Sequence, residues 1–242
     1  MKILVFMSDN RLKSTDYNSL VASINYEYCK KYGYDFIYYR PYLDNEMVVL
    51  NNCLDPNSGT PRHAAWSKLI STSKALELDY DYVAYIDSDC IFKDFNISLK
   101  DFIRNNINAK DILFFNNKPW GDDLPCSGFY ICKVSLYTKQ FIKDWYNYNI
   151  PERNTLHAWE QDALWKIFKE YNIQICNTQT FLIEENNQFL RHVSTFEKNN
   201  RLPYFKKFIE TVGIDYPKNI KEIKTIEFTT RPYGHSDTIY SS

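Results

Sequence analysis

The sequence predicts an α/β domain with a mixed, mainly parallel central sheet flanked by helices. Short runs of β-branched and aromatic residues alternate with segments whose apolar residues recur at helical spacing. The chain opens with a strand, a helix and a strand between residues 2 and 42, and such a unit implies two parallel strands. Its 242 residues, 44% hydrophobic and 17% aromatic, are enough for the core of one large domain.

The expected elements follow the chain in order. In the first half we expect strands at residues 2–7, 35–42 and 80–86, and helices from near Ser14 to Gly33 and from Pro61 to Leu76. Residues 43–60 are rich in Asp, Asn, Pro and Gly and predict a long loop. Pro61 favours a helix start because proline is tolerated in the first turn.

The second half continues the alternation. We expect strands at residues 112–115, 126–132, 173–176 and 189–193, and helices near 99–104, 135–148, 157–165 and 203–211. In the segment 135–148, the expected buried residues are Leu136, Phe141 and Trp145. Residues 226–230 fit either one more strand or an arm.

Charge, cysteines and hydropathy exclude several classes. The net charge is −1 and no polybasic run is present, so the footprint of a nucleic-acid-binding protein is missing. Six cysteines without a Cys-x-x-Cys pair predict buried free thiols and favour a reducing compartment. The apolar run at residues 2–7 is too short for a signal peptide, and no segment reaches the ~20 apolar residues of a membrane span. We therefore expect a soluble, cytoplasmic protein without a membrane span.

Two carboxylates, Asp87 and Asp89, end the apolar strand that begins at residue 80. Side chains at i and i+2 of an extended segment project to the same side, so both can approach one cation. Such hard oxygen ligands suit Mn²⁺ or Mg²⁺, particularly when a diphosphate supplies further oxygens. The carboxyl end of a strand is also where open α/β sheets bind ligands. An ordinary polar turn is the competing interpretation, because Asp and Ser are common turn residues.

Five short motifs occur in an order that resembles a known family. They are Arg62–Lys68 (RHAAWSK), Tyr85–Asp89 (YIDSD), Ser127–Ile131 (SGFYI), Glu160–Leu164 (EQDAL) and Phe189–His192 (FLRH). Together they span roughly residues 60–195 and resemble the GT-A glycosyltransferase family of α-galactosyl-, α-mannosyl- and xyloglucan α-xylosyltransferases. The lack of a membrane anchor is more similar to the soluble glycosyltransferases encoded by large DNA viruses of algae. Cys126 replaces the family's usual Asn, and the residues after His192 diverge, so the sugar and the acceptor stay open.

The resemblance implies a single GT-A domain over residues 1–242, with a nucleotide-binding half to about residue 95, an acceptor half over 96–215 and a C-terminal arm over 216–242. It implies metal-dependent transfer from a UDP-sugar to a glycan or glycoprotein acceptor, with retention of configuration. The implied Mn²⁺ ligands, with Mg²⁺ as the alternative ion, are Asp87, Asp89 and His192. The implied contacts to the nucleotide sugar are Ser8, Asp9, Arg62, Lys68, Asp87, Ser88 and Lys198. The implied residues at the transferred sugar are Glu160, Gln161 and Asp162.

Several alternatives remain open from the sequence. Asp162 or Glu160 could act as the base of an inverting enzyme, or both could only start a helix, where acidic residues are favourable. The chain could be a non-catalytic relative that binds a nucleotide or a glycan. His192 could be a structural histidine, and Arg62 and Lys68 ordinary solvated charges. A phosphatase of the Asp-x-Asp type is disfavoured, because its acidic pair would follow an early strand and Ile91 occupies the position of its Thr or Val.

Overall fold

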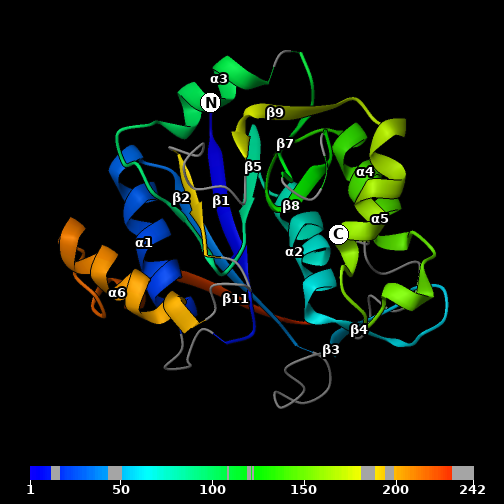
Figure 1. Cartoon of the computed structure of the whole chain (residues 1–242), viewed down its shortest axis with the longest axis horizontal. Helices are drawn as coiled ribbons and strands as arrows, with labels where there is room; N and C mark the ends of the chain where they lie inside the picture. Colours follow the sequence, from blue (N-terminus) through cyan, green and yellow to red (C-terminus); the bar gives the residue numbers. More distant parts are fainter. Residues whose placement is uncertain are drawn as a thin grey trace.

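The computed structural model describes residues 1–11, 17–42, 51–107, 109–118, 121, 123–180, 189–193 and 199–230. Its main elements are β1 (Ile3–Ser8), α1 (Tyr17–Tyr32), β2 (Asp35–Tyr42), β3 (Asn51–Leu54), β4 (Pro61–His63), α2 (Ser67–Leu76), β5 (Tyr82–Ile86), β6 (Cys90–Phe92), α3 (Leu99–Asn106), β7 (Ile112–Asn116), β8 (Pro125–Lys133), α4 (Leu136–Asn147), α5 (Glu160–Ile167), β9 (Ile173–Thr180), β10 (Leu190–His192), α6 (Arg201–Val212) and β11 (Lys224–Thr229). The predicted α/β class is confirmed (Figure 1).

Seven strands form the central sheet, in the order β11-β2-β1-β5-β8-β7-β9. Strands β11, β2, β1 and β5 run parallel to one another, and β7 runs parallel to β9, whereas β8 runs antiparallel to both β5 and β7. The sheet is therefore mixed and mainly parallel, as the sequence predicts. Because β1, β2 and β5 point the same way, the chain leaves all three at one edge of the sheet, where α/β proteins bind ligands.

Helices cover both faces of the sheet and create two apolar cores. The α1 and α6 helices lie on one side, and α2, α4 and α5 on the other (Figure 1). Side chains of β1 alternate between the cores: Val5 and Met7 join the first, and Leu4 and Phe6 the second. A strand buried on both faces reads as a continuous apolar run, which is why the sequence Ile3–Met7 contains no polar residue.

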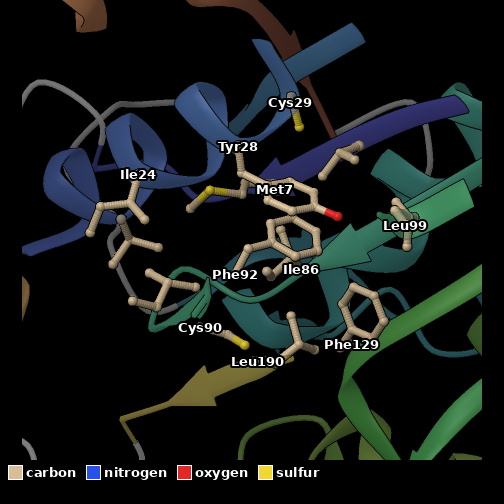
Figure 2. Close-up of a cluster of buried hydrophobic side chains, with 14 of the residues drawn as sticks. Met7, Ile24, Tyr28, Cys29, Ile86, Cys90, Phe92, Leu99, Phe129 and Leu190 are labelled. Atoms are coloured by element: carbon tan, nitrogen blue, oxygen red, sulfur yellow. The ribbon is translucent and has the colours of Figure 1, made fainter. Parts of the chain in front are cut away.

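An aromatic stack in the first core supports the short strand β6. Figure 2 shows Tyr28 of α1 and Phe92 of β6 together, and their rings lie 3.8 Å apart between centroids and only 13° from parallel. Met7, Ile86 and Leu190 belong to the same buried cluster. Offset aromatic pairs of this kind add about 0.5–1.5 kcal/mol to the stabilisation from burial alone. The cluster thus fixes β6 against the end of the sheet.

Two sequence predictions about helix boundaries and faces are wrong. Pro61 does not begin a helix: Pro61–His63 forms β4, paired with β3, and α2 begins at Ser67 after a short 3₁₀ turn. Proline is compatible with the first residue of a strand, and the β3 strand lies in the segment for which only a loop was expected. Residues 43–50 of that segment lie outside the described residues, as does the expected helix start at Ser14.

Leu136 is 86% exposed, although it was expected in the core of α4. Ser135 caps the helix, so Leu136 is its first residue. At about 100° per residue, position 136 lies about 140–180° around the helix from Phe141 and Trp145, which are both fully buried. The spacing of the three residues therefore places Leu136 on the opposite face.

The C-terminal segment and the cysteines can also be compared with the sequence predictions. Residues 224–229 form the strand β11, paired with β2, so the tail contributes to the sheet. The six cysteines are buried free thiols. Within the described ranges, no helix combines the length and apolar character needed to cross a bilayer.

Candidate active site

Asp87, Ser88 and Asp89 form the turn between β5 and β6. The N–H of Cys90 donates to the carbonyl of Asp87 at 3.0 Å, and the N–H of Asp87 donates to the carbonyl of Gly128 on β8 at 2.9 Å. The carboxylates therefore leave a tight turn, not the extended segment that the i, i+2 argument assumed. They still lie together at the carboxyl end of β5, because the turn is bonded to β8 beside it.

His192 reaches this turn through the pairing of two short strands. Strand β10 runs antiparallel to β6, with His192 opposite Cys90, and the N–H of Val193 donates to the carbonyl of Asp89 at 3.0 Å. The imidazole Nε2 lies 3.1 Å from Oδ1 of Asp89. One donor atom from each of Asp87, Asp89 and His192 lies within 4.8 Å of the others. Two carboxylates and an imidazole fit a Mn²⁺ or Mg²⁺ ion that keeps further positions for phosphate oxygens.

Asn25 of α1 holds the other edge of β6. Its side-chain NH₂ donates to the carbonyl of Cys90 at 2.9 Å, and its side-chain oxygen accepts from the N–H of Phe92 at 3.0 Å. The amide thus replaces a neighbouring strand, and β6 is bonded on both edges. Since Asn25 is fully buried, these bonds fix the backbone immediately after Asp89.

The two carboxylates have different electrostatic environments. Burial acts to raise the pKa of Asp89, but His192 and Arg201 outweigh it and lower that pKa to about 2. Burial raises the pKa of Asp87; the charge of Lys68 opposes this rise and the neighbouring Asp89 adds to it. Two negative groups this close repel each other, so a cation between them is favourable.

Lys68 of α2 links the acidic turn to α5. Its Nζ lies 3.0 Å from Oδ1 of Asp87 and 2.8 Å from Oε1 of Glu160, and the residue is only 5% exposed. Burial alone would lower the pKa of Lys68, but the charges of Asp87 and Glu160 outweigh it and raise that pKa. Lys68 is therefore a permanent cation beside the carboxylate pair.

Glu160 is the first residue of α5 and is buried at this junction. Its Oε1 accepts from the hydroxyl of Ser127 at 2.9 Å, in addition to the contact with Lys68. Its Oε2 is buried and has no hydrogen-bond partner within the part of the chain that the structure describes. A buried acceptor of this kind is uncommon in folded proteins and points to a missing donor.

The next two side chains of α5 are engaged with protein groups. Gln161 accepts from the N–H of Ser127 at 2.7 Å and donates to the carbonyl of Pro125 at 2.6 Å, so it docks α5 on β8. Asp162 forms an ion pair with Arg153, with Oδ2 2.7 Å from Nε.

The remaining residues expected to bind the nucleotide sugar lie in different surroundings. Ser8 and Asp9 lie where β1 ends; Ser8 shares a hydrogen bond with Ser71 at 2.8 Å, and the Asp9 carboxylate pairs with Arg11. Arg62 is completely buried against Asp55 and backbone carbonyls, so its guanidinium is not available to a diphosphate in this conformation. Lys198 lies outside the described residues.

Three side chains near the turn were not anticipated. Arg201 donates to Asp89, and Tyr17 accepts from both Arg201 and Arg11, at 3.0 and 3.2 Å. Arg11 follows Asp9 by two residues, so the polar loop after β1 offered a local signal for it. Nothing local distinguishes Arg201 from the other basic residues of its helix, because its position depends on how α6 packs on α1.

Comparisons with known proteins bear on the fold. No protein-family model and no curated protein matches the sequence. Among solved structures, the chain is similar to a glycosyltransferase involved in the glycosylation of the major capsid of PBCV-1, with a TM-score of 0.66 and 15% identity over 86% of this chain and 100% of that one. It is also similar to the galactosyltransferase LgtC in complex with donor and acceptor sugar analogs, with a TM-score of 0.57 and 11% identity over 91% of this chain and 100% of that one.

A third similar structure is the glycosyltransferase GlyE of Streptococcus pneumoniae TIGR4, with a TM-score of 0.54 and 12% identity over 91% of this chain and 62% of that one. Identities this low establish shared architecture and leave residue roles to the site itself. The mixed sheet, the acidic turn after β5 and these similarities agree with one another. The chain has the GT-A glycosyltransferase fold.

Proposed function

We propose that this protein is a metal-dependent glycosyltransferase that moves a hexose or pentose from a UDP-sugar to a glycan or glycoprotein acceptor. The observation that carries the proposal is the meeting of Asp87, Asp89 and His192 at the carboxyl end of β5 in a GT-A fold. The similar structure of LgtC holds donor and acceptor sugar analogs, which supports a sugar-transfer role for this arrangement.

Asp87, Asp89 and His192 would hold Mn²⁺, or Mg²⁺ as the alternative. The bound ion neutralises the negative charge that develops on the leaving diphosphate. Lys68 contributes a second positive charge that is buried and already oriented, so no reorganisation is needed as the diphosphate departs. Ser8 is the last residue of β1, Asp9 follows it, and Ser88 lies in the acidic turn; these three are the proposed contacts to the nucleoside and ribose.

Glu160 is the proposed contact to the transferred sugar. Its Oε2 is the buried acceptor described above, and a sugar hydroxyl supplies the donor that it lacks. Gln161 acts as a positioning residue, because the hydrogen bonds between its side-chain amide and β8 orient the start of α5. The carboxylate of Glu160 also places negative charge near an oxocarbenium-like transition state.

Retention of configuration is the stereochemistry that the ion pairs favour. An inverting enzyme needs a carboxylate that can accept the proton of the acceptor hydroxyl. Asp162 is held by Arg153 at 2.7 Å, and Glu160 by Lys68 at 2.8 Å, so both carboxylates are already engaged by cations of the protein and neither is free to approach an acceptor hydroxyl in this conformation. In a retaining reaction, the departing phosphate itself takes that proton.

We place the reaction in the cytoplasm, since six buried free thiols suit a reducing compartment. The similarity to a glycosyltransferase involved in the glycosylation of the major capsid of PBCV-1 supports a viral origin and a glycoprotein acceptor.

The test is a panel of UDP-, GDP- and CMP-sugars assayed for binding and hydrolysis with Mn²⁺, with Mg²⁺ and with EDTA. We expect one UDP-sugar to be hydrolysed only with a divalent ion, and NMR of the first product formed to show the donor's anomeric configuration. Preference for GDP- or CMP-sugars would contradict the donor assignment. Metal-dependent binding without turnover, with or without acceptor glycans, would favour the non-catalytic alternative.

A further inference from the structure

Arg201, the first residue of α6, is hydrogen-bonded to Asp89, one of the proposed metal ligands. One of its terminal nitrogens donates to Oδ2 of Asp89, its Nε donates to the carbonyl of Val193 at 2.8 Å, and its other terminal nitrogen donates to the Tyr17 hydroxyl at 3.0 Å. The side chain is only 12% exposed. Three contacts therefore hold the guanidinium against Oδ2 of Asp89, while His192 lies against the other oxygen of the same carboxylate, Oδ1.

A second arginine approaches from β1. Arg11 binds the Asp9 carboxylate through two nitrogens at 2.9 and 2.7 Å, and it reaches the Tyr17 hydroxyl at 3.2 Å and Ser88 Oγ at 3.4 Å. The two guanidinium carbons lie 5.3 and 4.9 Å from the centroid of the Tyr17 ring. One tyrosine thus brings two arginines to the edge of the acidic turn. Each arginine is already paired with a carboxylate, so it becomes available to an anionic ligand only when that pairing changes.

The contact with Asp89 conflicts with metal binding. A divalent ion on Asp89 places two positive charges beside a guanidinium that bonds to the same carboxylate, and the two cations repel each other. A nucleoside diphosphate relieves that repulsion, because its oxygens are the bidentate partners that arginine prefers. Val193 and Tyr17 can retain the arginine at the site while its third contact changes.

We propose that Arg201 neutralises Asp89 until metal and nucleotide bind, and then transfers to the diphosphate. The inference rests on the proposed function. Arg201 is in this view a competitor of the metal ion and a ligand of the nucleotide, so its removal has opposite effects on the two. A purely structural arginine would weaken both.

The experiment measures Arg201→Gln beside the parent protein and the control Arg104→Gln, which removes an exposed arginine paired with Asp101 on α3. Titration with Mn²⁺ alone, followed by electron paramagnetic resonance of the free ion, should show tighter binding in Arg201→Gln. Calorimetry at saturating Mn²⁺ should show UDP binding weakened by about tenfold or more, as expected for a lost charge-assisted contact. The loss should be smaller for UMP and absent for uridine. Arg104→Gln should match the parent throughout.

Unchanged or weaker binding of Mn²⁺ alone would overturn the competition, and an equal loss for UDP, UMP and uridine would overturn the diphosphate contact. If Arg201→Gln does not fold, Arg201→Lys gives the same test, because it keeps the charge but loses the planar fork, and both shifts should keep their sign at smaller size. Failure of the proposed function is distinguishable: the parent itself would then lack Mn²⁺-dependent UDP binding. The arm with Mn²⁺ alone would still report whether Arg201 competes for Asp89.

Discussion

Two Arg–Asp pairs in this molecule differ in their exposure and in their surroundings. Arg62 and Asp55 lie 3.2 Å apart with both side chains 0% exposed. Arg201 and Asp89 are also hydrogen-bonded, but their side chains are 12% and 16% exposed, and Asp89 also faces His192. The first pair is sealed within the protein, whereas the second retains access to solvent.

The partners of each pair explain the difference. Arg62 also donates to Asn154 and to the carbonyls of Tyr146 and Tyr148, and Asp55 accepts from Asn154, Asn57 and Ser58. These groups connect the β3–β4 hairpin to the segment that follows α4. Arg62 and Asp55 therefore bond to the same set of protein groups. Around Asp89, in contrast, donor atoms from three side chains converge on one point. Convergent ligand atoms, and not burial of an ion pair, are the reason why we propose a metal-binding role for Asp89.

The largest expected effect is on the sealed pair. Arg62→Gln leaves Asp55 buried without its cation, and such a loss costs about 3–5 kcal/mol of unfolding free energy. Urea denaturation should show this loss, and the double variant with Asp55→Asn should lose less than the sum of the two single changes, because the residues share one network. UDP affinity of the folded fraction should be unchanged. A fall in UDP affinity at parental stability would instead restore Arg62 as a donor contact.

The site pair should respond in the opposite way. Asp89→Asn should weaken Mn²⁺-dependent UDP binding by at least about 100-fold, because it removes a charged ligand and not merely an outer-shell contact. Relative to the parent, the free energy of unfolding should fall much less in Asp89→Asn than in Arg62→Gln. Calorimetry with Mn²⁺ and with EDTA measures the first effect, and Asp101→Asn on the exposed face of α3 is the control. UDP binding that ignores EDTA would contradict the metal site.

A smaller effect separates His192 from a structural histidine. His192→Ala should weaken Mn²⁺ and UDP binding together by about tenfold, and His192→Asp should recover part of the loss by restoring an oxygen ligand. A core histidine would behave otherwise: both variants would melt earlier, by about 1–3 kcal/mol of stability, and bind Mn²⁺ and UDP like the parent. Mn²⁺ titration beside melting temperatures decides between the two.

The sequence predicted the sheet better than the charged pairs. Strand β2 and the helices α1, α4 and α6 are visible because apolar periodicity depends on the local chain. The acidic turn and His192 were identified through motif order, although the turn is not extended. Arg62 was selected because it lies close in sequence to the acidic strand. Its partner, Asp55, was not recognised. The two residues are brought together by the pairing of β3 with β4, and these strands are too short to be visible in the sequence.

Arg201 was missed for a related reason. Its contact with Asp89 joins residues 112 positions apart, through the packing of α6 on α1. Charge alone does not tell which basic residue of a helix faces a site, since Lys206 and Lys207 lie on the same helix and are exposed. Long-range contacts of this kind follow from tertiary structure and leave no local pattern.

The smallest expected effect is the pH dependence of the sealed pair. Burial acts to raise the pKa of Asp55, but hydrogen bonds from Asn154 and Asn57 and the charge of Arg62 outweigh it and lower that pKa below its usual 3.8. A carboxyl with a depressed folded pKa stabilises the protein above its unfolded pKa, and this contribution is lost as pH falls through the folded value. The stability difference between the parent and Asp55→Asn should therefore be constant near neutral pH and shrink in acid below about pH 4.

Urea denaturation of both proteins across that acid range measures the change, with Asp101→Asn as the exposed control. The control difference should stay nearly level, because an exposed carboxylate gains little from folding. A difference between the parent and Asp55→Asn that stays level or widens in acid would mean that the carboxylate is not held by these hydrogen bonds. The pair would then owe its stability to packing around Arg62, whose guanidinium lies 3.9 Å from the ring centroid of Trp66.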